Sequence, residues 1–159
     1  MKDGLEAVCV FQNSKITGHI IFKEFITQKM TGISLHLKNV PKGKHGIHIH
    51  QSGDLREGCK SLCSHFNPYN KYHGGPDDTE RHVGDLGNIE PNANGVVKIT
   101  LYDNKIKLSG KNSVIGRSVV IHEKEDDLGK GGNAESLKTG NAGSRIACGV
   151  IGISKNSCQ

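Results

Sequence analysis

The sequence lacks tryptophan, and aromatic residues make up only 4% of its 159 residues. No apolar run approaches the ~20 residues that a membrane-spanning helix requires, which excludes an integral membrane protein with such helices. No long basic run is present, so the net charge of +5 favours anionic partners in general and argues against a dedicated nucleic-acid binder. Five cysteines are too few for a disulfide scaffold. The first residues contain no apolar segment, so we expect no signal peptide and a cytoplasmic location.

Apolar residues instead alternate with polar ones at a period of two, which is typical of strands with one buried face. Eight short runs of this kind, separated by Gly, Asn, Asp, Ser or Pro, predict an all-β antiparallel sandwich or barrel. The length fits a single domain, 1–159, with 155–159 as a short polar tail. The predicted strands lie near residues 7–11, 16–22, 33–38, 47–50, 97–102, 105–108, 118–122 and 146–152.

Two long segments, 51–87 and 123–143, interrupt this rhythm. Loops beyond about 12–15 residues are usually functional or disordered. The second segment contains one possible helical turn at 134–137, which flanking glycines keep short. The first segment contains metal-ligand residue types, so we expect it to be ordered by an ion.

His48 and His50 are two residues apart on a predicted strand, so their side chains point the same way. His122 ends a second strand. If the two strands are neighbours, their imidazoles form the nitrogen-rich kind of site that suits Cu(II).

A second candidate set lies within the first long segment. Three histidines and a carboxylate suit Zn(II), whereas Ca(II) and Mg(II) prefer oxygen ligands. The set is His65, His73, His82 and Asp85.

Longer motifs resemble those of copper/zinc superoxide dismutases of the cytosolic type. They include GIHIH at 46–50, HFNP at 65–68, HGGP at 73–76, RHVGDLGN at 81–88 and GNAGSRIACGVIG at 140–152. The resemblance extends from about residue 7 to 154. It implies a Greek-key, eight-stranded sandwich or barrel of immunoglobulin-like architecture with two long functional loops. It also implies an enzyme that converts superoxide to dioxygen and hydrogen peroxide by cycling Cu(II)/Cu(I) beside a structural zinc.

The resemblance assigns metal ligands residue by residue. Copper would be held by His48, His50, His65 and His122, and zinc by His65, His73, His82 and Asp85. His65 would therefore serve both metals. It would also be a catalytic residue, taking up a proton when copper is reduced and helping the peroxide to leave.

Other roles follow from the same resemblance. Asp126 would hydrogen-bond His48 and His73, Arg145 would attract and dock the superoxide anion, and Cys59 would pair with Cys148. The resemblance further implies a homodimer and a copper chaperone as a partner. The remaining residues that it identifies are Glu135, Lys138 and Thr139 for the channel, and Gly53, Ile115, Gly116 and Ile153 for the dimer interface.

The sequence departs from the family at Cys63, where relatives usually carry a small residue without a thiol. Cys63 could be an inert thiol, a competitor for Cys59 or an extra metal donor. Ala134 replaces a frequent acidic residue, which favours stronger attraction of anions at low salt. Two other classes remain as alternatives: a metallochaperone, which needs a further domain or a Cys-x-Cys motif, and a zinc-storing domain, which leaves the copper set and Arg145 without a purpose.

Overall fold

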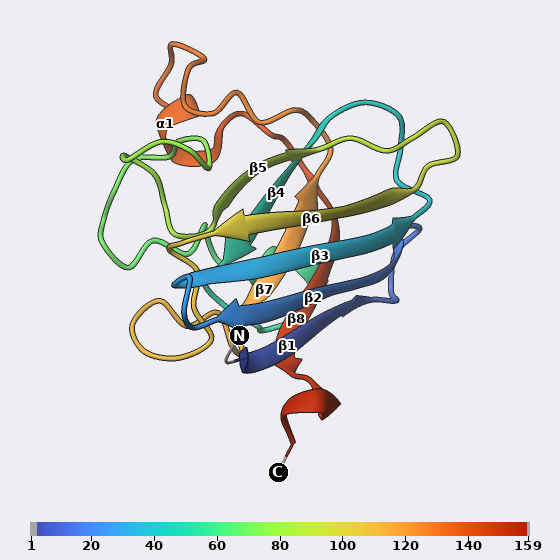
Figure 1. Cartoon of the computed structure of the whole chain (residues 1–159). Coiled ribbons are helices and arrows are strands. Elements are labelled where there is room, and N and C mark those ends of the chain that lie inside the picture. Colours follow the sequence, from blue (N-terminus) through green and yellow to red (C-terminus); the bar gives the residue numbers. More distant parts are fainter. Residues whose placement is uncertain (1–2, 159) are drawn as a thin grey trace.

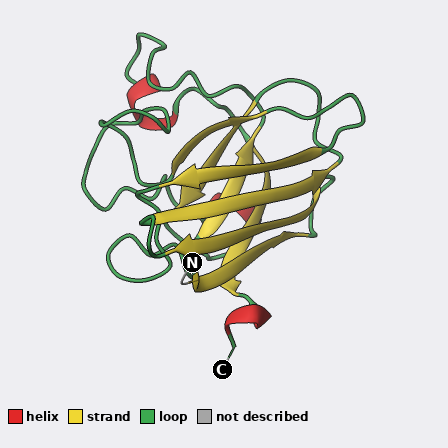
Figure 2. Ribbon diagram, viewed as in Figure 1, coloured by secondary structure: helices red, strands yellow, loops and turns green. Residues whose placement is uncertain are grey.

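A computed structural model describes residues 3–158 and consists of eight antiparallel strands with little helix (Figures 1 and 2). The strands are β1 (Asp3–Phe11), β2 (Thr17–Phe25), β3 (Met30–Lys38), β4 (His45–His50), β5 (Asp85–Ile89), β6 (Val97–Asp103), β7 (Ser118–His122) and β8 (Arg145–Ile153). Three short helical segments complete the chain: η1 (Gly58–Ser61), α1 (Ser136–Thr139) and η2 (Lys155–Ser157). The all-β prediction is therefore confirmed.

The strands form a nearly closed barrel with the order β5-β4-β7-β8-β1-β2-β3-β6. In Figure 1, β1, β2, β3 and β6 cross in front of the other four strands. The chain passes between the two halves three times, from β3 to β4, from β5 to β6 and from β6 to β7, and it places β6 beside β3 and β7 beside β4, as in a Greek key. The connection from β4 to β5 and the connection from β7 to β8 are the two long loops.

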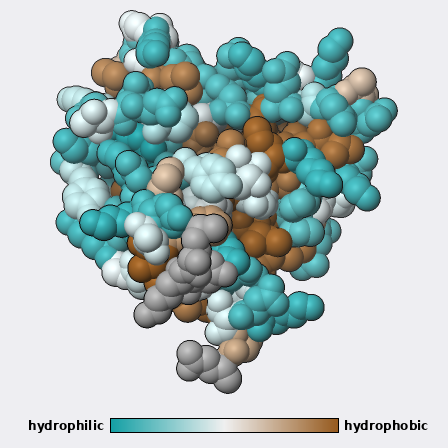
Figure 3. Space-filling view, in the orientation of Figure 1, coloured by the Kyte–Doolittle hydropathy of each residue, from teal (hydrophilic) through white to brown (hydrophobic). Residues whose placement is uncertain are grey.

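Strand alternation builds the core between the two halves. On the β2–β3 ladder, for example, Ile20 faces Leu35 and both side chains are fully buried, while the next pair points outward. Strands β4 and β7 differ because every one of their residues is buried. One face of these two strands packs in the core, and the long loops cover the other. The visible outer face of the molecule is mostly polar, with apolar side chains showing between (Figure 3).

One predicted strand is wrong, and one observed strand was not predicted. Residues 105–108 do not form a strand, although Ile106 and Leu108 are buried in the core. The carboxylate of Asp103 accepts hydrogen bonds from the backbone N–H groups of Lys105 and Ile106, so the chain turns where a strand would have continued. Conversely, β5 begins within the last residues of the segment 51–87 that we predicted to be loop, and it continues to Ile89. It pairs with β4 alone, and its residues lack the β-branched run that marks most strands.

The predicted helical turn is present as α1, about two residues later than expected. The tail begins with η2, whose N-cap Ser154 accepts a hydrogen bond from the backbone of Asn156. Gln159 lies outside the described residues, as do Met1 and Lys2, where a signal peptide would begin. Within residues 3–158, no helix is long and apolar enough to cross a membrane.

Candidate metal centre

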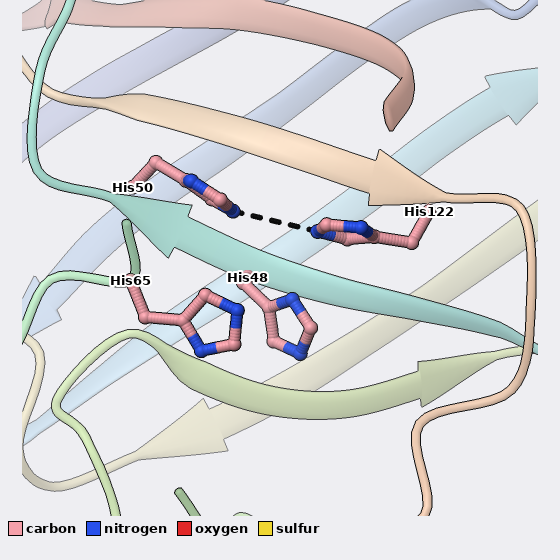
Figure 4. A group of neighbouring side chains, drawn as sticks. All are labelled: His48, His50, His65 and His122. Atoms are coloured by element: carbon pink, nitrogen blue, oxygen red, sulfur yellow. Dashed lines mark hydrogen bonds between the residues drawn. The ribbon is translucent and has the colours of Figure 1, made fainter. Parts of the chain in front are cut away.

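Four buried imidazoles meet on the outer side of β4 and β7 (Figure 4). The antiparallel register, which pairs Ile47 with Ile121, brings the histidines of both strands to one place. The fourth histidine comes from the long loop, where residue 65 forms an isolated bridge with residue 50. One ring nitrogen from each residue lies within 4.8 Å of those of the others. This four-histidine group consists of His48, His50, His65 and His122.

Hydrogen bonds to the protein fix the orientation of these rings. His50 Nδ1 lies 2.8 Å from the carbonyl of Cys63, and His122 Nδ1 lies 3.0 Å from that of Gly143. Their Nε2 atoms are 3.4 Å apart, marked by the dashed line in Figure 4. Because one nitrogen of each ring is held by a backbone acceptor, the other is directed into the group as a ligand.

A second group gathers around a carboxylate at the start of β5. Three ring nitrogens lie close to Asp85 Oδ1: His73 Nδ1 at 2.9 Å, His65 Nδ1 at 3.0 Å and His82 Nδ1 at 3.2 Å. We call these four residues the Asp85 group. A ligand atom of His48 also lies within 4.8 Å of those of His65, His73 and Asp85. We nevertheless assign His48 to the four-histidine group, because the rings within 3.2 Å of Asp85 Oδ1 are those of His65, His73 and His82.

The two groups fit metal ions. His48 Nδ1 and His73 Nδ1 are the buried side-chain atoms without a hydrogen-bond partner in the described part of the chain. His73 Nδ1 does lie near Asp85 Oδ1, but the alignment does not suit a hydrogen bond. An unsatisfied buried polar atom costs about 1–3 kcal/mol, which a bound cation removes. Nitrogen and carboxylate donors suit copper and zinc.

The four-histidine group is kept neutral by its surroundings. Burial lowers the pKa of His50 to about 2 and that of His122 to about 4, and it holds the pKa of His48 well below its usual value. Neutral rings present lone pairs, so these histidines are ready to bind a metal at neutral pH.

The Asp85 group holds a charge. Burial alone would raise the pKa of Asp85, but the hydrogen bond from His65 and the close approach of His73 and His82 outweigh it and hold that pKa far below the usual range. Burial likewise opposes protonation of His73, but Asp126 and Asp85 raise its pKa to about 9. A metal entering this group must therefore displace a proton from His73.

Asp126 connects the two groups. Its Oδ2 accepts a hydrogen bond from His48 Nε2 and its Oδ1 accepts one from His73 Nε2, each at 2.7 Å. The side chain of Asn88 in β5 forms two hydrogen bonds with the backbone of Asp126. Its Oδ1 accepts from the N–H at 2.7 Å, and its Nδ2 donates to the carbonyl at 2.9 Å. Gly140 stands so close that a side chain there would overlap Asp126 Oδ1. The carboxylate is thus held in place from several directions.

A pocket opens from solvent onto His50, His65 and His122 of the four-histidine group. Arg145 lies on its wall, with Nη1 donating to the carbonyl of Cys59 at 2.7 Å and Nη2 to that of Cys63 at 2.6 Å. The structure joins Cys59 to Cys148 by a disulfide, which ties this loop to β8. The other predicted channel residues also line the pocket: Glu135, Lys138 and Thr139.

Several residues of the centre were not predicted from the sequence. Asn88 lies within the RHVGDLGN motif at 81–88, but its contact with Asp126 depends on β5, which the sequence did not predict as a strand. The carbonyls of Cys63 and Gly143 have no sequence signature, because every residue supplies the same acceptor. Arg81 is a further case: it is buried, and its Nη1 lies 2.8 Å from Asp103 Oδ2, which fixes the loop before β5 to the end of β6.

Cys63 is exposed and is not in a disulfide, and its backbone has a φ of 64°. The left-handed region costs a residue with a Cβ roughly 1–2 kcal/mol. Glycine escapes this cost but loses more entropy on folding. We therefore expect Cys63→Gly to raise the free energy of unfolding by about 0.5–1 kcal/mol in urea titrations. Cys63→Ser keeps the Cβ and should show no gain; an equal gain in both variants would trace the effect to the thiol instead.

Comparison with known proteins agrees with this geometry. The family model described as "Copper/zinc superoxide dismutase (SODC)" matches residues 16–151. A superoxide dismutase [Cu-Zn] of Yarrowia lipolytica is 51% identical over 151 residues, covering 94% of this chain and 98% of its own. An extracellular superoxide dismutase [Cu-Zn] of Drosophila melanogaster is 50% identical, covering 89% and 78%. The crystal structure of the clock protein EA4 superposes with a TM-score of 0.91 at 45% identity, covering 97% of this chain and 98% of its own.

Proposed function

The chain belongs to the copper/zinc superoxide dismutase family, and we propose that its two buried ligand groups divide the chemistry, with copper in the four-histidine group and zinc in the Asp85 group. The protein is an oxidoreductase that converts two superoxide anions and two protons into dioxygen and hydrogen peroxide. Copper would supply one-electron redox chemistry in the four-histidine group, and zinc would supply a fixed positive charge in the Asp85 group. The observation that carries the assignment is the position of His65 between the groups.

His65 is proposed to handle a proton as well as to bind. Its Nδ1 is engaged in the Asp85 group, which leaves Nε2 facing the four-histidine group. Burial lowers the pKa of His65, so a proton on Nε2 is released readily. We assign to Nε2 the delivery of this proton to the peroxide product.

Arg145 is proposed to dock the substrate. Its two hydrogen bonds to backbone carbonyls hold the guanidinium on the pocket wall. Burial is the main reason why the pKa values of His50 and His122 are low, and the positive charge of Arg145 lowers both further. A fixed cation at the mouth of a pocket concentrates small anions there.

We expect Arg145→Ala to lower kcat/KM for superoxide by about tenfold at low salt and to flatten its dependence on ionic strength. Copper and zinc contents, measured by mass spectrometry, should be unchanged, since Arg145 is in neither ligand group. Arg145→Lys keeps the positive charge but cannot donate to both carbonyls in the same way. Its kcat/KM should lie between those of wild type and Arg145→Ala. If Arg145→Ala had the same kcat/KM as wild type at every salt concentration, Arg145 would not dock the substrate.

The assembly and the location are also proposals. We propose a homodimer built on Gly53, Ile115, Gly116 and Ile153. Supporting this, Ile153 is 47% exposed, and Gly53 packs directly against the carbonyl of Gly116. Sedimentation at micromolar concentration tests the dimer.

We also propose a cytoplasmic location, which cell fractionation tests. We propose that a carrier protein delivers copper, because the four-histidine group is buried below its pocket, and copper loading in vivo tests this point.

A further inference from the structure

A pair of histidines lies outside the metal centre, on the outer face of the β2–β3 ladder. His19 and His36 stand directly opposite each other in the antiparallel register. Their rings are stacked, with centroids 5.1 Å apart and planes at 25°. The next pair along, Ile20 and Leu35, points into the core, so both imidazoles face outward. His36 is exposed and His19 is half-buried.

Two members of the four-histidine group have nearly the same mutual arrangement. The rings of His50 and His122 are 5.5 Å apart at 29°, and their Nε2 atoms are 3.4 Å apart. The spacing of His19 and His36 therefore allows one nitrogen of each ring to reach a common ion. Directly opposed residues on antiparallel strands hold their side chains at this separation without any change in the backbone.

Neither of these rings is committed elsewhere. Within residues 3–158, the side chains of His19 and His36 contact each other through their rings, and neither side chain forms a hydrogen bond. In the four-histidine group, by contrast, backbone carbonyls hold one nitrogen of His50 and of His122. All four nitrogens of the outer pair are thus available to a ligand.

We propose that His19 and His36 form an additional, exposed binding site for a divalent transition metal, with water completing the coordination. Imidazole nitrogen suits Cu(II), Ni(II) and Zn(II), whereas Ca(II) and Mg(II) need oxygen ligands that this face does not supply at the pair. Affinity should follow the order Cu(II) above Ni(II), with Zn(II) below Cu(II).

The charges around the pair keep this site weak. Lys98 of β6 faces His36 across the ladder, and Lys38 lies two residues further along β3 on the same face. On the other side, His19 faces the apolar side chain of Val10. Two nearby cations repel a metal ion. The outer site is therefore expected to fill only after both buried groups, and its ion should exchange freely with solvent.

The test titrates Ni(II) into holoenzyme whose buried groups already hold copper and zinc, followed by calorimetry and by paramagnetic broadening of amide signals. We expect one further Ni(II) per chain, with broadening centred on residues 19 and 36. His19→Asn and His36→Asn should each weaken Ni(II) binding by at least about tenfold, because each variant retains only one of the two imidazole ligands. Lys98→Gln should strengthen it by about threefold.

Because both rings point outward, the asparagine variants should fold, and an unchanged thermal midpoint verifies this. Absence of a further Ni(II), or Ni(II) affinity that is the same in wild type and both histidine variants, overturns the proposal. Broadening centred on other residues overturns it as well. None of these readouts depends on dismutation, so the outer site and the metal centre are tested separately.

Discussion

Replacing His122 with asparagine is expected to lower dismutation by at least about a hundredfold while zinc remains bound. Mutation of a residue that only hydrogen-bonds to a metal ligand typically lowers metal affinity or activity 10–100-fold. His122 is proposed to be a ligand itself, so its loss should have a larger effect. It belongs to the four-histidine group and is not one of the residues around Asp85, so the proposed zinc ligands stay complete. Superoxide consumption, metal analysis and the electron-paramagnetic signal of Cu(II) measure the result.

The reciprocal control is His73→Asn, which removes a donor from the Asp85 group and leaves all four histidines of the other group in place. Its zinc content should fall first. If His122→Asn retained full copper and most of its activity, or lost zinc in preference to copper, the assignment of copper to the four-histidine group would be wrong.

Replacing Asp126 with alanine is expected to weaken zinc binding by about 10–100-fold and to lower activity as well. The change removes the acceptors of both His48 and His73, so both rings lose the bond that sets their orientation. The pKa of His73 should also fall, since Asp126 helps to raise it against the effect of burial. Competition with a chelator of known affinity measures zinc binding.

Asp126→Asn is the graded control. Its single amide oxygen can accept from one of the two rings, while its NH₂ group faces the N–H of the other. We therefore expect wild type, Asp126→Asn and Asp126→Ala to decline in that order. Zinc affinity and activity within about threefold of wild type in the alanine variant would show that the carboxylate does not organise the centre.

The sequence allowed much of this molecule to be predicted, for physical reasons. Histidines can be recognised as ligand candidates because few other side chains bind transition metals, and alternation placed His48 and His50 on one side of a strand. Alternation failed at Ile106 and Leu108, which reach the core from a turn held by Asp103. Any apolar side chain that packs inward produces the same pattern, whether or not its backbone is in a strand.

The predictions from sequence were weakest where a contact is made by a backbone group or by a residue that is distant in the sequence. The bond between Asn88 and Asp126 joins residues 38 apart and exists only because β5 lies beside β4. The carbonyl of Cys63 serves both His50 and Arg145, although its thiol was the feature that attracted attention. Tertiary placement, rather than residue type, decides such contacts.

The sheet order leaves β5 and β6 as its two terminal strands, and this arrangement links zinc supply to solubility. Terminal strands carry unpaired backbone groups that can recruit another chain and start aggregation. Strand β5 is five residues long and begins at Asp85, the carboxylate around which three histidines gather. A zinc ion in the proposed site would anchor the first residue of the strand, so we expect zinc removal to loosen this edge of the sheet.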